Sequence, residues 1–316
     1  MSKRLSLAKP CRIRWCEAVN EAVAIPTVDA LIEREQLPQS YRAIIDAHWR
    51  PLTVRIAAWF SEAARPIIVG VNGGQGSGKT TLCLFLEEIL LPEAGLRAVT
   101  LSLDDFYLSK PERRTLADKV HPLFAVRGVP GTHDVPLMIA SLHKLRSGVG
   151  ALVPRFDKAL DDRPPEAKWR RIAGPVDVVL FEGWCVGAAP QTEEALIVPV
   201  NALEAEEDPD GVWRRHVNRA LAAEYRELFR MIDRLVILRA PNMETILANR
   251  REQERKLRDA RPDAPNLLSD ADVARFVQFY ERLTRWMLAE LPARADVVFD
   301  LADLTRVQTS VGGTSR

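Results

Sequence analysis

The chain of 316 residues has 47% hydrophobic and 28% charged residues and a net charge of +1, which is the balance of an ordinary globular protein with ample material for a core. This charge favours neither nucleic acid nor a membrane as partner, and no apolar run approaches the roughly 20 residues of a membrane helix. The four cysteines form no C-x-x-C pair, which argues against disulfides or structural zinc and predicts a cytoplasmic location. No feature indicates a particular oligomeric state.

Residues 1–65 predict an N-terminal helical extension. Prolines punctuate the segment, and no residue in it suggests chemistry. We therefore expect it to pack against the rest of the chain rather than to form an independent domain. The basic N-terminus has no hydrophobic signal core, although an organellar transit segment stays open. The helical spacing is carried by Trp15, Val19, Val23, Ala43, Ile44, Ala47 and Trp49.

The stretch Ile67–Thr81 (IIVGVNGGQGSGKTT) carries the strongest motif of the chain. A β-branched run enters a glycine-rich turn that fits G-x-x-x-x-G-K-[ST], and a helical apolar pattern follows. Glycines let backbone N–H groups surround a phosphate, Lys79 reaches the β and γ phosphates, and the Thr80 hydroxyl ligates Mg²⁺. The sequence thus predicts a nucleotide phosphate site formed by Gly73, Gly74, Gln75, Gly76, Ser77, Gly78, Lys79, Thr80 and Thr81.

Two carboxylates follow the next predicted strand, Arg97–Leu103. Asp104 and Asp105 stand at its carboxyl end, where ligands bind in open parallel sheets. Such a pair suits general-base or Mg²⁺ chemistry beside a γ-phosphate. The alternative is a simple turn, since Asp often ends strands. The position directly after the phosphate loop favours the functional interpretation.

The middle of the chain predicts loops with charged residues. His121–Asp134 is rich in Gly and Pro, and its Arg127 and His133 could hold a small anionic or hydroxylated ligand, although such a loop is often only a connection. A helix is expected over Pro136–Leu145. Ala151–Phe156 predicts a short edge strand because of its internal proline.

A second strand-end carboxylate follows Pro175–Phe181, a predicted buried strand. Glu182 comes directly after it, in a Walker-B-like arrangement that can hold Mg²⁺ directly or through water. A strand-end carboxylate without function is the alternative. Trp213–Met231 predicts one helix, and Leu235–Leu238 another short strand.

The C-terminal part predicts two helices and a last strand. Pro241–Ala260 is rich in arginine, which indicates either a solvated helix or a lid that places an arginine on the transferring phosphate. Ser269–Leu291 has an apolar stripe expected to join the core. Ala295–Leu301 predicts the last strand, and Thr309–Arg316 a disordered tail.

These elements predict an α/β fold of the P-loop NTPase type. We expect a doubly wound, mostly parallel sheet with helices on both faces, formed by residues 66–308 and preceded by the helical extension.

Several strand-to-loop junctions together resemble one family. In chain order they read GGQGSGKTT, SLDDFYL, RGVPGTHD, PRFDK with a downstream DR, and FEGW. This combination resembles the ATP-dependent D-glycerate 3-kinases of plants and fungi, within the group that includes uridine kinase, phosphoribulokinase and pantothenate kinase. The resemblance spans about residues 66–305.

The resemblance implies a role for each matching residue. Asp104 stands where these kinases keep the general base, and it is also a candidate metal ligand together with Thr80 and Glu182. Arg250 is the best match to the lid arginine, so the implied catalytic set is Asp104, Lys79 and Arg250. The implied small-molecule acceptor is D-glycerate, with ATP and Mg²⁺ as the donor pair. The residues implied to contact the acceptor are Asp105, Tyr107, Arg127, His133, Asp157, Lys158, Arg163 and Trp184.

One stretch departs from the family pattern. The family usually has a glycine-rich GxGDR after the FDK segment, where this chain has Ala159-Leu160-Asp161-Asp162-Arg163. The aspartate and arginine remain but the glycines do not, which changes the backbone freedom of the loop and bears on the identity of the acceptor.

Two other functions stay open. A kinase for another small acceptor, such as a nucleoside, a sugar phosphate or pantothenate, would share the phosphate loop, but a nucleoside site would need more stacking aromatic residues. A nucleotide-dependent switch or ATPase would need a water-positioning glutamine or a guanine-reading N-K-x-D. No N-K-x-D occurs in the chain.

Overall fold

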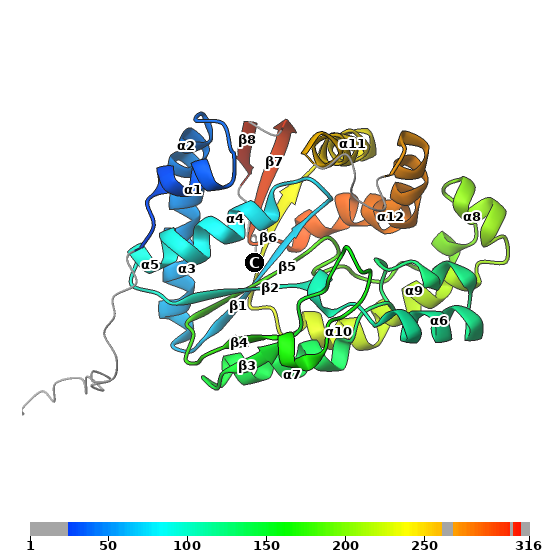
Figure 1. The fold of residues 1–316 in the computed structure, drawn as a ribbon, viewed down its shortest axis with the longest axis horizontal. Helices are drawn as coiled ribbons and strands as arrows, with labels where there is room; N and C mark the ends of the chain where they lie inside the picture. Colours follow the sequence, from blue (N-terminus) through cyan, green and yellow to red (C-terminus); the bar gives the residue numbers. More distant parts are fainter. Residues whose placement is uncertain (1–24, 261–267, 304–305, 311–316) are drawn as a thin grey trace, which may run out of the picture.

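The computed structural model describes residues 25–260, 268–303 and 306–310. Within them a six-stranded sheet has the order β2-β5-β1-β6-β7-β8, with all neighbours parallel except β7 and β8. Helices cover both faces of this sheet (Figure 1), so the predicted α/β class is confirmed. The strands are β1 Ile67–Gly73, β2 Ala98–Ser102, β5 Val178–Gly183, β6 Arg234–Arg239, β7 Val297–Asp303 and β8 Arg306–Ser310.

Side-chain alternation assigns each strand to two cores. In β1, Val69 and Val71 join the core on one face while Ile68 joins the core on the other. The same alternation separates Leu180 from Phe181 in β5. A central parallel strand that buries both faces needs apolar residues throughout, which explains the continuous apolar runs of these strands.

The N-terminal helices and the helix after the phosphate loop cover the first face. They share one core with β1, β5, β6 and β7, so the part of the extension that the structure describes packs on the sheet. These helices are α1 Val28–Arg34, α2 Tyr41–Ile44, α3 Arg50–Ala63, α4 Lys79–Phe85 and α5 Leu91–Glu93, with π-helical turns at Ile45–Trp49 and Leu86–Leu90. The expected helical positions Trp15, Val19 and Val23 lie outside the described residues.

The remaining helices cover the second face and extend beyond it. Apolar residues of α7, α9, α10 and α12 share the second core with β1, β5 and β6. The elements are α6 Lys110–Lys119, α7 Val135–Arg146, α8 Ala202–Glu207, α9 Val212–Ala222, α10 Glu224–Phe229, α11 Met243–Ala260 and α12 Asp270–Glu290. No helix of the described residues is long and apolar enough to cross a membrane.

Three sequence predictions need correction. Ala151–Val153 forms β3, which pairs not with the main sheet but with β4 (Arg170–Ile172) in a separate antiparallel hairpin. The single helix expected over Trp213–Met231 is two helices, because Ala223 leaves helical geometry with φ −104° and ψ −103°. Thr309 and Ser310 belong to β8, so no disordered tail begins at Thr309, and residues 311–316 lie outside the described residues.

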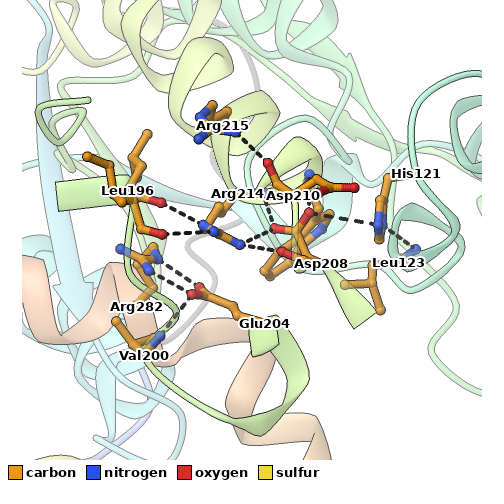
Figure 2. A network of polar contacts seen from close by, with 12 residues as sticks. His121, Leu123, Leu196, Val200, Glu204, Asp208, Asp210, Arg214, Arg215 and Arg282 are labelled. Atoms are coloured by element: carbon orange, nitrogen blue, oxygen red, sulfur yellow. Dashed lines mark hydrogen bonds and ion pairs between the residues drawn. The ribbon is translucent and has the colours of Figure 1, made fainter. Parts of the chain in front are cut away.

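Two buried ion pairs stabilise the end of the molecule that is formed by α8, α9 and α12. Figure 2 shows Arg214 between Asp208 and the carbonyl of Leu196, and Arg282 against Glu204. Both Arg282–Glu204 contacts measure 2.7 Å, and the four side chains are between 0 and 9% exposed. Buried charges of this kind are tolerated only when they are paired and hydrogen-bonded.

Candidate active site

A cavity of about 1040 Å³ lies where the phosphate loop and the carboxyl ends of β2 and β5 meet. This is the edge at which open parallel sheets bind ligands. It is lined by the phosphate loop, by the turn after β2 and by the segment between β3 and β4. The lining residues are Gln75, Gly76, Gly78, Lys79, Thr80, Thr81, Ser102, Asp104, Asp105, Arg155, Phe156, Asp157, Lys158, Leu160, Asp162, Arg163, Pro164, Pro165, Lys168, Glu182 and Gln253.

The phosphate loop has the geometry of an anion cradle. Gly76 and Gly78 adopt left-handed backbone angles with φ of +74° and +86°, and a Cβ on Gly76 would come within 2.8 Å of Asn249 in α11. The Ser77 hydroxyl is buried, and no hydrogen-bond partner for it lies among the residues that the structure describes. Because an orphaned hydroxyl is costly, a phosphate oxygen or a water is the partner that its surroundings require. The loop therefore fits the phosphates of ATP.

Thr80 and Glu182 come together at the base of the cavity. The Thr80 hydroxyl lies 3.4 Å from a Glu182 carboxylate oxygen, and both line the cavity. Glu182 lies inside β5 rather than after it, paired with Ser102 and Val71. Within the described residues no cluster of three or more His, Cys, Asp or Glu could hold a metal. A site with few protein oxygens is nevertheless suitable for Mg²⁺, because this ion keeps several waters and binds substrate phosphates as its other ligands.

Asp104 lies in a 3₁₀ turn, Leu103–Phe106, directly after β2. One of its oxygens accepts from the Tyr107 hydroxyl at 2.9 Å and the other from the Lys158 ammonium at 2.9 Å. Burial opposes the charge of Asp104, but Lys158, Lys79 and the Tyr107 hydrogen bond outweigh it and lower its pKa to about 2. The negative charge of Asp104 in turn raises the pKa of Lys158. Asp104 is therefore ionised near neutral pH.

The pKa of the neighbouring Asp105 is shifted in the opposite direction. Burial raises its pKa to about 6, although it accepts from the Phe156 amide at 3.2 Å. Both carboxylates line the cavity. Two adjacent carboxylates with pKa values displaced in opposite directions are typical of acid–base chemistry.

Tyr107 and His133 support the site from behind. Both residues are only 3% exposed, and neither lines the cavity. Their rings stack at 4.5 Å, and His133 Nδ1 lies 2.5 Å from the hydroxyl of Tyr225. Burial lowers the pKa of His133 to about 3, which keeps the ring neutral. Backbone contacts between Tyr107 and His133 bring the expected acceptor loop to the end of β2.

The arginines predicted on the acceptor side have protein partners. Arg127 forms a short ion pair with Asp161 and does not line the cavity. Arg163 does line it, and donates to Asp134 at 2.8 Å and Glu112 at 3.2 Å. Asp157 and Lys158, also predicted there, both line the cavity.

The structure does not bring Trp184 or Arg250 to the cavity wall. Trp184 is buried, and its indole N–H donates to the Gly128 carbonyl at 2.9 Å. Arg250 pairs with Glu254 at 2.8 Å and lies over the Phe276 ring. From the same helix α11, Gln253 reaches the cavity.

Comparisons with known proteins agree with this geometry. The chain is 36% identical over 227 residues to a Schizosaccharomyces pombe protein named "Uncharacterized kinase mug58", a match covering 68% of this chain and 79% of that protein. It is 29% identical over 245 residues to the chloroplastic D-glycerate 3-kinase of Arabidopsis thaliana, covering 73% of this chain and half of that protein. No protein-family model matches the chain.

A solved structure shows the same relation. The D-glycerate 3-kinase from Cryptococcus neoformans superposes with a TM-score of 0.68 at 25% identity, covering 84% of this chain and 99% of that one. This chain belongs to the D-glycerate 3-kinase family of P-loop kinases. It is an ATP-dependent kinase.

Several residues that line the cavity of this kinase were not predicted as site residues from the sequence. Arg155 precedes the predicted Asp157-Lys158 pair within PRFDK, so its motif was a usable signal. Asp162 belongs to the DR that follows. Lys168 carries no motif, and Gln253 lies in the predicted lid segment Pro241–Ala260, where Arg250 rather than Gln253 was singled out. The full set is Ser102, Arg155, Phe156, Leu160, Asp162, Pro164, Pro165, Lys168 and Gln253.

Proposed function

We propose that this kinase transfers the γ-phosphoryl group of ATP to a hydroxyl of D-glycerate. The observation that carries the proposal is the placement of Asp104 in one cavity with the phosphate loop and with several cations. A hydroxyl can meet the carboxylate there while an acidic group meets a cation. The names of the Arabidopsis and Cryptococcus relatives support the same acceptor.

The donor side follows from the phosphate loop. Lys79 and the loop amides would hold the phosphates of ATP, and the Ser77 hydroxyl would find its missing partner there. Thr80 and Glu182 would hold Mg²⁺, with Asp104 as a further candidate ligand. Bound Mg²⁺ neutralises charge on the phosphate oxygens.

On the acceptor side, Asp104 would orient the attacking hydroxyl and take its proton. The oxygen of that hydroxyl forms the new bond to phosphorus as the bond to the ADP oxygen breaks. Arg155, Lys158 and Arg163 are the cations that would meet the acceptor carboxylate, with Asp105 and Asp157 beside them. Tyr107 and His133 would act behind Asp104 by holding its orientation.

The predicted roles of Arg127, Trp184 and Arg250 stay proposals, and those of the two arginines require movement. Arg127 would have to leave Asp161, and Arg250 would have to exchange Glu254 for a phosphate oxygen. Trp184 would act as a wall from its buried position. The cytoplasmic location expected from the cysteines stays a prediction.

An acceptor screen tests the proposal. Purified protein with ATP and Mg²⁺ is assayed against D-glycerate, uridine, ribulose 5-phosphate and pantothenate, with ADP release as the readout. We expect acceptor-dependent turnover with D-glycerate alone. Turnover with a different acceptor, or with none while ATP still binds, would refute the assignment of D-glycerate.

A further inference from the structure

We propose that Lys158 is a latch on Asp104: its ammonium covers the carboxylate until an acidic acceptor draws it away. The latch links acceptor binding to the release of the general base and suppresses the transfer of phosphate to water. It rests on the proposed function, because it requires a hydroxyl acceptor that also carries a negative charge.

The two oxygens of Asp104 have partners that differ in exposure: one partner is buried and the other is exposed. Tyr107, which holds one oxygen, is 3% exposed and stacked against His133, so it cannot leave without disturbing the core. Lys158, which holds the other, has a side chain that is 64% exposed. The oxygen on Lys158 is therefore the one that can be freed. We expect an incoming hydroxyl to use that oxygen, because Lys158 can move away from it whereas Tyr107 stays fixed beside the other.

The backbone around Lys158 is fixed. Asp157 and Asp162 form a two-way bridge at 3.0 and 3.2 Å across the turn, and Asp157 also accepts from the Ala159 and Leu160 amides. Arg113 and Arg127 hold Asp161 within the same turn. Release of Asp104 therefore requires only rotation of the flexible lysine side chain, not movement of the loop.

A small hydroxy acid has the chemistry to release this latch. Its hydroxyl and its carboxylate are separated by only a few covalent bonds, so a hydroxyl on Asp104 places the carboxylate within the swing of Lys158. An exposed ion pair is weak, and breaking it should reduce acceptor affinity by less than about tenfold. A neutral polyol of the same size offers no charge to the ammonium and leaves the latch closed.

With the latch closed, water is a poor acceptor. In hydrolysis the water oxygen bonds to the γ-phosphorus, the bond to the ADP oxygen breaks, and a proton passes to Asp104 on its way to solvent. The Lys158 ammonium donates a hydrogen bond to the oxygen that would take this proton, and its positive charge opposes protonation there. Hydrolysis of ATP is therefore slow until the acceptor arrives.

The first test compares ATP hydrolysis without acceptor in Lys158→Met and in the matched control Lys144→Met. Lys144 is an exposed residue of α7 outside the cavity lining, and its replacement makes the same change of charge and shape. We expect hydrolysis to rise at least about threefold in Lys158→Met and to stay at the wild-type rate in Lys144→Met. An unchanged or lower rate in Lys158→Met, or an equal rise in both variants, would overturn the latch.

The second test measures binding rather than turnover, by calorimetric titration with D-glycerate. Asp104→Asn frees Lys158, so we expect affinity for D-glycerate to rise about threefold or more; Lys158→Met should weaken it. The double variant should bind as weakly as Lys158→Met. Unchanged or weaker binding by Asp104→Asn would contradict the latch. If the wild type does not bind D-glycerate, the proposed acceptor is wrong, and the hydrolysis comparison still decides whether Lys158 covers Asp104.

Discussion

Two ion-pair regions of this molecule use the same chemistry under opposite conditions. In the network of Figure 2, the two ion pairs Arg214–Asp208 and Arg282–Glu204 have side chains that are at most 9% exposed and are held by several hydrogen bonds. In the cavity, the pair of Lys158 and Asp104 is 64% and 32% exposed, and one hydrogen bond joins it. The first arrangement cannot exchange partners without unfolding its surroundings. The second can, which is what a site for an ionic substrate requires.

The largest effect is expected from Asp104→Asn, which removes the proton acceptor from the exchangeable region. We expect kcat to fall about 100- to 10,000-fold, because general-base catalysis contributes a factor of this size. ATP affinity should be kept, since the phosphate loop is unchanged. Steady-state kinetics and nucleotide titration measure the two properties. Normal turnover would remove Asp104 from the role of base.

Glu204→Ala removes one partner of the buried ion pair between Glu204 and Arg282. It leaves the Arg282 guanidinium without its carboxylate, and we expect the free energy of unfolding to fall by about 3–5 kcal/mol. The matched control is Glu207→Ala on the same helix, where the pair with Arg275 is 40 and 48% exposed and is worth about 0–1 kcal/mol. Denaturant unfolding compares both variants. Equal losses would show that burial does not separate the two kinds of pair.

Ser77→Ala tests whether the phosphate loop awaits a ligand. The buried hydroxyl has no hydrogen-bond partner in the described part of the chain, so its removal should leave the stability of the free protein unchanged or higher. Affinity for ATP should fall about tenfold or more, because a hydrogen bond to a charged phosphate contributes about 1.5–3 kcal/mol. A large loss of stability with unchanged ATP affinity would assign this hydroxyl to the fold instead.

The last prediction concerns the pH dependence of stability and His133. Its folded pKa of about 3 lies below the unfolded value of about 6.5, so the unfolded chain takes up the proton first as pH falls. Stability should be complete above pH 6.5 and be lost toward pH 3, by about 2 kcal/mol at pH 5 for this group. Unfolding of the wild type and His133→Phe at pH 7 and 5 isolates this contribution. An identical loss in both proteins would show that His133 is not held neutral.

Sequence patterns predicted the elements whose signals are local. The strand at Ile67–Gly73 and the phosphate loop follow from a continuous apolar run and a glycine motif. The hairpin strand β4 was missed because Arg170 and Arg171 are exposed and give no apolar alternation. The break at Ala223 has no proline or glycine to mark it.

Within the site, the sequence could not predict which ion pairs the charged residues form. Lys158 and Asp104 are 54 residues apart, and their ion pair depends on how the turn between β3 and β4 folds over the end of β2. Arg127 was expected to face the acceptor, but Asp161 engages it. Asp161 adopts a left-handed φ of +54° at a position where the family pattern has glycine. The glycine of the family pattern explains the backbone conformation at Asp161, but only the structure reveals its ion pair with Arg127.

The most direct test of the central claim is phosphorus NMR of wild-type protein incubated with ATP, Mg²⁺ and D-glycerate. The account predicts a new phosphate monoester signal that grows with the ADP signals, requires D-glycerate and is lost in Asp104→Asn. Formation of ADP and inorganic phosphate alone, at a rate that D-glycerate does not change, would contradict it.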